Sequence, residues 1–314
     1  METFDLRYPF THPANAPRQV VLAMGFFDGV HLGHQAVLAK ARALATAKGV
    51  PLAVMTYDHH PHIVFQKLPT QYQYLSPNKR QNELFAMAGV DVVYRLSFTS
   101  KLAKLTPQAF VDEVLMALDP VAVVAGFDHT YGADINVANM EHLPTFVAGR
   151  FDVISVPKAD FNHEKIGSRT IHEVLDAGQV DLANEMLGYT YQTTGLIVHG
   201  EALGRTLGFP TANVLTPADE KIPGVGVYGV RVKIADQWYE GDASVGYNQT
   251  IGEGRPKTLE IFIFDFHEEI YGENVEVQWC HYVRGMEKFA GLEELVAQLH
   301  QDEADVRAFF ANEK

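Results

Sequence analysis

The rhythm of apolar segments changes once along the chain, and this change limits the possible fold more than any other feature of the sequence. From Val20 to about Leu187, short apolar runs such as VVLAM, PLAVMTY and VAVVAGF alternate with longer segments of helical spacing. Alternating strands and helices are typical of a parallel sheet whose faces are covered by helices. We therefore expect an α/β domain here, with ligands at the carboxyl ends of its strands.

After residue 187, β-rich runs follow one another without intervening helices, as in VGVYGVRVKI, KTLEIFIFDF and NVEVQWCHYV. Closely spaced strands predict an antiparallel barrel or sandwich. Leu292, Leu295, Val296 and Leu299 recur at helical spacing, which predicts a closing helix that packs on these strands. With 314 residues the chain is long enough for two cores, and we predict domains at 1–186 and 187–314.

Charge and cysteine content narrow the classes of partner. The formal net charge is −14 and no basic stripe is present, so we expect no nucleic-acid partner. The single cysteine, Cys280, cannot form an internal disulfide and is expected to be a packing residue. No stretch reaches the uncharged length of a membrane span. The sequence therefore predicts a cytoplasmic protein without a membrane partner.

The stretch GFFDGVHLGHQ lies where an expected strand ends and an expected helix begins. Gly29 and Gly33 remove side-chain bulk, and His31 and His34 share one helical face. The free N–H groups of a first helical turn bind anions such as phosphate, and two imidazoles would add donors. The alternative is that the histidine pair only caps and solvates the helix.

Three further patterns have simpler explanations. DHHPH offers His59, His60 and His62 to a metal, but we favour a loop in which His60 faces the same pocket as GFFDG. GVGVYG satisfies G-x-G-x-x-G, yet a strand rather than a helix follows it, so the match is accidental. Thr106 before a proline predicts a helix start.

Four motifs, GFFDGVHLGHQ, TYDHHP, GFDHTYG and GRTLGFPTAN, occur in an order and spacing that resemble the bacterial bifunctional riboflavin kinase/FAD synthetases over nearly the whole chain. The resemblance implies a nucleotidyltransferase-like α/β parallel-sheet domain that adenylylates FMN. A six-stranded all-β barrel domain that phosphorylates riboflavin would follow, with the C-terminal helix. The implied ligands are riboflavin, FMN, FAD, ATP as co-substrate and Mg²⁺, and no obligate protein partner is evident.

In the first domain, the resemblance implies that His31 and His34 are catalytic and that Asp128 defines the flavin side of the site. Ser168 and Arg169 would meet the ATP phosphates, with Ser168 capping the helix RTIHEVLDAG. Gly167, the Arg169–Thr170 order and His172 depart from the family pattern. The remaining nucleotide- or substrate-binding residues implied by the resemblance are Gly25, Phe27, Asp28, Gly29, Gly33 and His60.

In the second domain, the resemblance implies that Thr211 and Asn213 hold Mg²⁺, for which a hydroxyl and an amide oxygen are suitable hard ligands. Glu260 would be the general base, its alternative being an ordinary outward glutamate on a strand. Arg284 would lie near the substrate, its alternative being a surface arginine. The other implied binding residues are Gly204, Arg205, Gly208 and Pro210.

Two rival functions stay open at this point. The closest rival to the bifunctional enzyme, motivated by the altered KIGSRTIH segment, is a riboflavin kinase whose adenylyltransferase domain is impaired. A non-catalytic flavin-binding sensor belongs to another class, but binding alone does not require Thr211, Asn213 and Glu260 together.

Overall fold

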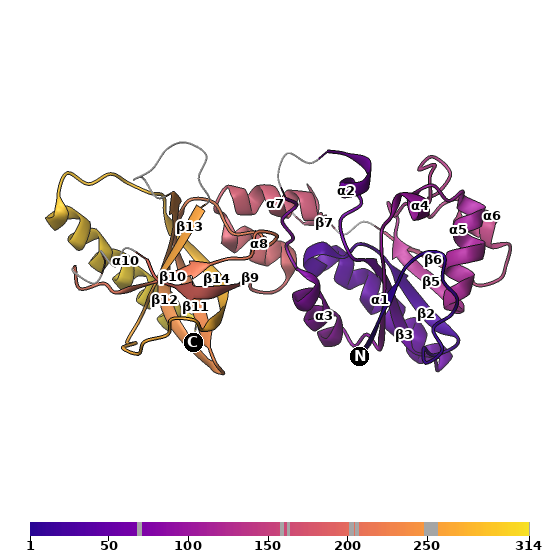
Figure 1. Cartoon of the computed structure of the whole chain (residues 1–314), viewed down its shortest axis with the longest axis horizontal. Helices are drawn as coiled ribbons and strands as arrows, with labels where there is room; N and C mark the ends of the chain where they lie inside the picture. Colours follow the sequence, from indigo (N-terminus) through magenta and orange to yellow (C-terminus); the bar gives the residue numbers. More distant parts are fainter. Residues whose placement is uncertain are drawn as a thin grey trace. The chain divides into compact units, whose positions relative to one another are not determined.

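The strands of the first half form a parallel sheet in the order β1-β4-β3-β2-β5-β6 in a computed structural model of the chain (Figure 1). The structure describes residues 1–67, 71–157, 160–161, 164–200, 204, 207–247 and 257–313. It divides into two units, Met1–Ser168 and Arg169–Lys314. The sheet strands are β1 (Glu2–Leu6), β2 (Val20–Met24), β3 (Leu52–Tyr57), β4 (Val92–Leu96), β5 (Pro120–Gly126) and β6 (Asp152–Val156).

Every residue of β2, β3 and β4 is buried, because helices cover both faces of the sheet. Figure 1 shows α1 on one side of these strands and α5 on the other. The expected parallel sheet with helices is therefore confirmed. Its helical segments are η1 (Asp28–Val30), α1 (Leu32–Lys48), α2 (His62–Phe65), α3 (Asn78–Met87), α4 (Ser100–Ala103), α5 (Pro107–Phe110), the π-helix η2 (Val111–Leu115), η3 (Met116–Leu118) and α6 (Leu143–Val147). A short antiparallel pair, β7 (Asp160–Phe161) and β8 (Glu164–Lys165), lies near its end.

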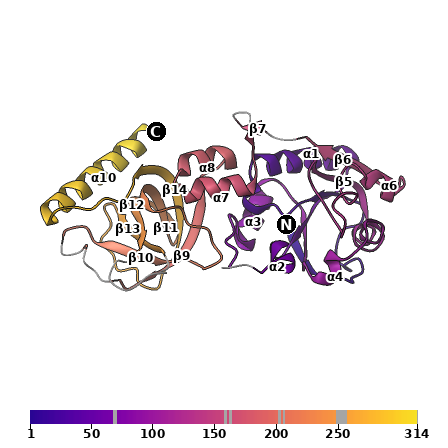
Figure 2. The same ribbon diagram turned by 90° about the horizontal axis from the view of Figure 1, so that it is seen from above.

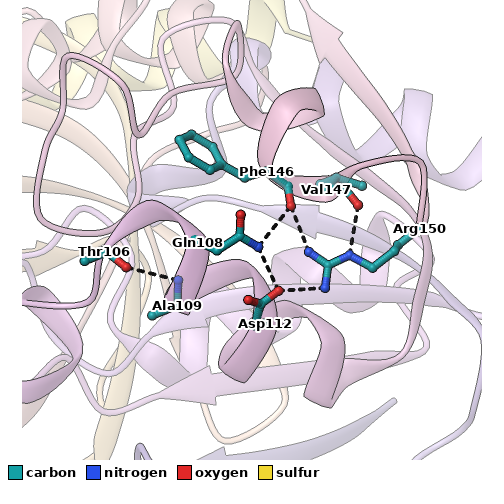
Figure 3. A network of polar contacts seen from close by, with 7 residues as sticks. All are labelled: Thr106, Gln108, Ala109, Asp112, Phe146, Val147 and Arg150. Carbon is teal, nitrogen blue, oxygen red and sulfur yellow. Dashed lines mark hydrogen bonds and ion pairs between the residues drawn. The ribbon is translucent and has the colours of Figure 1, made fainter.

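The helix start predicted at Thr106 is confirmed, and a polar network continues from it (Figure 3). The Thr106 hydroxyl accepts a hydrogen bond from Ala109 N at 3.2 Å. Arg150 donates to the Asp112 carboxylate at 2.6 Å and to the Phe146 carbonyl at 2.8 Å. These bonds join η2 to α6 on one face of the sheet.

Strand β1 was not predicted. It pairs in parallel with β4, from Glu2 opposite Val92 to Leu6 opposite Leu96. As an edge strand it buries only part of its surface, and Phe4 and Leu6 pack against the core. Its alternating ETFDL sequence lacks the continuous apolar run of the central strands.

The second half forms a closed antiparallel barrel in the order β10-β13-β12-β11-β14-β9, so the barrel rather than the sandwich is correct. Two helices precede the barrel: α8 (Val180–Leu187) contacts β14, and in α7 (Ser168–Asp176) the Leu175 carbonyl accepts a hydrogen bond from Gly224 N at 2.8 Å. In α8, Asn184 donates to the Trp279 carbonyl at 2.8 Å. The units thus divide at 168/169, whereas the boundary of activities at 186/187 stays a prediction. The strands are β9 (Gln192–Val198), β10 (Thr211–Leu215), β11 (Gly226–Ile234), β12 (Gln237–Tyr247), β13 (Lys257–Ile263) and β14 (Asn274–Arg284).

The closing helix α10 (Leu292–Asn312) is confirmed and lies along the barrel (Figure 2), but its packing face differs from the one predicted. Leu292 is 66% exposed, whereas Val306 and Phe310 are buried against the strands. Gly229 on β11 makes this possible, because a Cβ there would lie 3.3 Å from a Val306 methyl. Cys280 is a free thiol in the same cluster, which confirms its packing role.

Candidate active sites

The turn after β2 has an unusual backbone that prepares the start of α1. Phe27 has a φ of 57°, Gly29 of 76° and Val30 of 35°. Positive φ is costly for residues other than glycine, and such strain collects at ligand sites. Phe27 and Val30 lack the conformational freedom of glycine, so contacts with the surrounding protein must stabilise the backbone of this turn.

Asp28 supplies those contacts from inside the protein. Its side chain is 1% exposed and accepts hydrogen bonds from the backbone N of Leu75 at 2.9 Å and of Ser76 at 3.0 Å. The Ser76 hydroxyl accepts from Gly29 N at 2.7 Å. These bonds tie the turn to the segment before α3. The predicted contact of Asp28 with a nucleotide stays a prediction.

The two motif histidines lie together at the start of α1. His31 is the N-cap, and its Nδ1 accepts a hydrogen bond from His34 N at 3.4 Å. The two rings stack with centroids 3.7 Å apart and an interplanar angle of 18°. Burial, with the nearby His31 and His129, holds the pKa of His34 well below its usual range. His34 is therefore neutral at physiological pH, able to donate one hydrogen bond without carrying charge.

Phe27 and Gly25 support this turn by packing. Phe27 is 1% exposed and meets Phe85 edge-on, with ring centroids 5.5 Å apart. A Cβ on Gly25 would lie 3.0 Å from the Phe27 ring. A side chain buried this deeply supports the turn by packing, and the predicted ligand contact of Phe27 stays a prediction. Gly33 is the second residue of α1.

An aromatic cluster beside the turn was not predicted as a unit. His60 stacks on Tyr72 with centroids 4.4 Å apart and meets Phe26 edge-on at 4.9 Å. The Tyr72 hydroxyl donates to Asp28 at 3.4 Å, and burial raises the pKa of Tyr72. His60 thus lies beside GFFDG as expected. Within the described ranges, no group of three or more His, Cys, Asp or Glu side chains is arranged to hold a metal ion.

Asp128 and Ser168 are further predicted residues of the first unit, and Arg169 is the first residue of the second unit. Asp128 is exposed in the loop after β5, the strand next to β2. Ser168, the last residue of the first unit, is also the first residue of α7, and its hydroxyl donates to the Asp28 carbonyl at 2.9 Å. The Arg169 side chain is 93% exposed and pairs with Glu173 at 3.0 Å.

In the barrel, the predicted metal ligands and base lie on one face. Thr211 Oγ1 donates to Glu260 Oε2 at 3.0 Å, and Asn213 stands directly opposite Glu260 in the β10–β13 register. The flanking Leu259 and Ile261 are buried, so Glu260 points away from the barrel interior. The structure therefore assembles a hydroxyl, an amide and a carboxylate at neighbouring positions.

A tight turn precedes this cluster. Phe209 N donates to the Gly204 carbonyl at 2.9 Å, and Gly208 has a φ of 86° that favours glycine. Pro210, Thr211 and Tyr271 are among the residues that line a pocket of about 400 Å³. The predicted residue Arg205 lies outside the described residues.

Arg284 is engaged elsewhere in the barrel unit. Its Nε and Nη2 donate to the two oxygens of Asp302 at 2.8 and 2.6 Å, and Asp302 is 2% exposed. These bonds raise the pKa of Arg284. A bidentate pair with a buried carboxylate anchors α10 to β14. Contact of Arg284 with a substrate stays a prediction.

A parallel sheet with a histidine pair at a helix start, and a barrel with clustered hard oxygen donors, define a two-domain enzyme class that works on phosphate groups. The family model of FAD synthetase matches residues 14–170, and that of riboflavin kinase matches residues 187–310. The chain belongs to the bifunctional riboflavin kinase/FMN adenylyltransferase family.

Full-length relatives carry that name. The protein of Listeria monocytogenes is 44% identical over 99% of both chains, and that of Bacillus subtilis is 35% identical over 99% of both. A solved structure named macrolide-efflux protein from Streptococcus pneumoniae has a TM-score of 0.90 and 35% identity, covering 96% of this chain and 98% of its own. Its name differs from that of the sequence relatives, although its fold matches over both units. None of the described helices is long and apolar enough to cross a membrane.

Proposed function

We propose that the first unit transfers the adenylyl group of ATP to FMN, and that the second unit transfers the γ-phosphate of ATP to riboflavin. The observation that carries the proposal is the presence in one chain of two separate donor clusters. These are the stacked His31 and His34 at the start of α1 and the Thr211–Glu260 pair beside Asn213. Family membership over both units supports it.

In the adenylyl transfer, a phosphate oxygen of FMN bonds to the α-phosphorus of ATP while the bond to the leaving pyrophosphate breaks. Negative charge develops on phosphate oxygens, and fixed donors stabilise it best because they need no reorganisation. The N-terminal end of α1 favours such an anion through its N–H groups and partial positive charge, and neutral His34 would add a donor. The stack on His31 fixes its ring orientation.

In the kinase reaction, the riboflavin 5′-hydroxyl oxygen bonds to the γ-phosphorus and the bond to ADP breaks. Glu260 accepts the hydroxyl proton. Thr211 and Asn213 would hold Mg²⁺, and their hydroxyl and amide oxygens are the hard donors that this ion prefers. When bound, the ion neutralises charge on the phosphate oxygens. A Cβ on Gly200 would overlap the Asn213 amide, so glycine there lets this side chain take its place.

One assay tests the proposal. The purified chain is incubated with riboflavin and Mg·ATP, and FMN and FAD are resolved by chromatography. Both products are expected. Formation of FMN alone would mean that the adenylyltransferase unit is impaired. If neither product forms, the chain would be a flavin-binding protein that does not catalyse a reaction.

If the two activities have separate sites, a single substitution should remove one activity and leave the other. We expect His31→Ala to remove most FAD formation while riboflavin phosphorylation stays near normal, because the donor clusters lie in different units with their own cores. Glu260→Gln is the reciprocal control, in which FMN supplied from outside should still be converted to FAD. Equal loss of both activities in either folded variant would contradict the two-site proposal.

A further inference from the structure

Two imidazole nitrogens beside the turn after β2 are buried without a hydrogen-bond partner among the described residues. They are Nδ1 of His34 and Nε2 of His129. Buried polar atoms are nearly always satisfied, and exceptions call for an explanation such as a ligand. His12 in the same unit differs, because both of its ring nitrogens lie within hydrogen-bonding distance of backbone carbonyls, at 3.1 Å and 3.2 Å.

The sheet brings these two histidines together from distant parts of the chain. β5 lies next to β2, with Ala125 opposite Met24, so the loop that carries His129 and the turn that leads into α1 and His34 leave the sheet at neighbouring points. A turn in which His129 N donates to the Gly126 carbonyl at 2.9 Å fixes the start of its loop. Positive charge on His129 would also oppose protonation of His34, which places the rings within electrostatic reach.

His129 is neutral at physiological pH. Burial lowers its pKa to about 4, although the neighbouring Asp128 acts in the opposite direction. A neutral imidazole carries one N–H donor and one acceptor nitrogen. With hydrogen on Nε2, the unpartnered nitrogen becomes a donor beside the helix start, where the partial positive charge of α1 already favours an anion.

We propose that His129 is a third imidazole of the adenylyl-transfer site, donating from Nε2 to a phosphate oxygen of the bound nucleotide beside His34. The proposal rests on the function proposed for the first unit. It assigns His129 to ATP and not to FMN, because His129 lies within electrostatic reach of His34 at the helix start that would hold a phosphate. Motif reading selected Asp128 from GFDHTYG and passed over the next residue.

The test compares two substitutions at the same position. His129→Phe keeps a ring but removes the donor, whereas His129→Gln keeps an N–H group near the place of Nε2. FAD synthesis is measured from supplied FMN while the ATP concentration is varied, so the kinase reaction is not needed. Loss of a hydrogen bond to a charged group predicts an increase of about 10- to 100-fold in the KM for ATP with Phe, with at least partial rescue by Gln.

Matched measurements keep the test decisive. His12→Phe is the control for a histidine with a structural role, expected to change the melting temperature and leave the KM for ATP unchanged. The KM for FMN and the kinase activity of both His129 variants should also stay unchanged. Wild-type ATP dependence in His129→Phe would overturn the inference, as would equal impairment of Phe and Gln variants with lowered melting temperatures. Absence of FAD synthesis by the wild-type chain would instead overturn the function proposed for the first unit.

Discussion

Asp242→Asn should stabilise the barrel unit, and the gain should grow with pH. Asp242 lies on β12 and faces α10, where burial together with the charges of Asp302 and Glu303 raises its pKa from 3.8 to about 7. Arg284 opposes this shift, but its guanidinium is already held by Asp302. The folded barrel therefore contains a carboxyl group that resists ionisation at neutral pH.

The direction of the pH dependence follows from proton linkage. The folded state holds the proton more tightly than the unfolded state, so this group's stabilising contribution is complete below pH 3.8 and is lost as the pH rises towards 7. A shift of about 3 pKa units corresponds to at most about 4 kcal/mol, at 1.36 kcal/mol per unit. Asp242 is only half-buried by surface area, and we expect about 1 to 2 kcal/mol after solvent screening. Asparagine removes the titration while keeping a similar shape.

The assay is urea unfolding at pH 5 to 8, followed by tryptophan fluorescence. Both tryptophans of the chain, Trp238 and Trp279, lie in the barrel unit, so this signal reports the unit that contains the substitution. The free energy of unfolding should exceed that of wild type by a small amount at pH 5 and by a larger amount at pH 8. Asp265→Asn is the control, an exposed aspartate whose pKa a hydrogen bond from Arg307 lowers, so it should give no gain. A gain independent of pH, or a loss at pH 8, would refute the reasoning.

Three other substitutions test the proposed sites. Glu260→Gln should lower riboflavin turnover about 10²- to 10⁴-fold, the usual cost of a lost general base. Flavin fluorescence quenching should show that binding persists. Turnover at the wild-type rate would assign the base to another group. Asn213→Ala should raise the Mg²⁺ and ATP concentrations needed for the kinase reaction, and an unchanged Mg²⁺ titration would count against its role as a ligand. Arg169→Ala should raise the KM for ATP in FAD synthesis and leave the kinase activity unchanged, because arginine binds polyphosphate by charge-assisted hydrogen bonds. An unchanged ATP dependence would mean that its exposed guanidinium does not contact the nucleotide.

The central strands could be predicted from the sequence because they are buried on both faces and appear as continuous apolar runs. β1 could not, since an edge strand buries one side only and alternates as ETFDL. For α10, apolar spacing predicted the helix but not its packing face. That face depends on the bare backbone of Gly229, which admits Val306, and on the Asp302–Arg284 pair. Neither is a local property of the helix sequence.

Motif residues were easier to identify than their contacts. His31 and His34 lie where the spacing predicts, stacked at the start of α1. Spacing does not reveal burial, and it could not show that Asp28 bonds to the backbone of residues 75 and 76 or that Phe27 belongs to the core. The electrostatic influence of His129 on His34 depends on the neighbouring positions of β2 and β5, which only the strand order defines.

The pairing of β1 with β4 has a consequence for how the chain behaves outside the folded state. Without β1, the edge of β4 would present unpaired backbone groups along a run that includes Val92, Val93 and Tyr94. An exposed, flat and apolar strand edge is a template for intermolecular pairing and aggregation. The outer β1 replaces it with a short strand bearing Glu2 and Asp5, whose charges oppose the addition of another strand. The five residues of β1, which β4 and β3 separate from β2 in the sheet, thus favour solubility, and deleting them would lower the yield of native protein before it altered any catalytic constant.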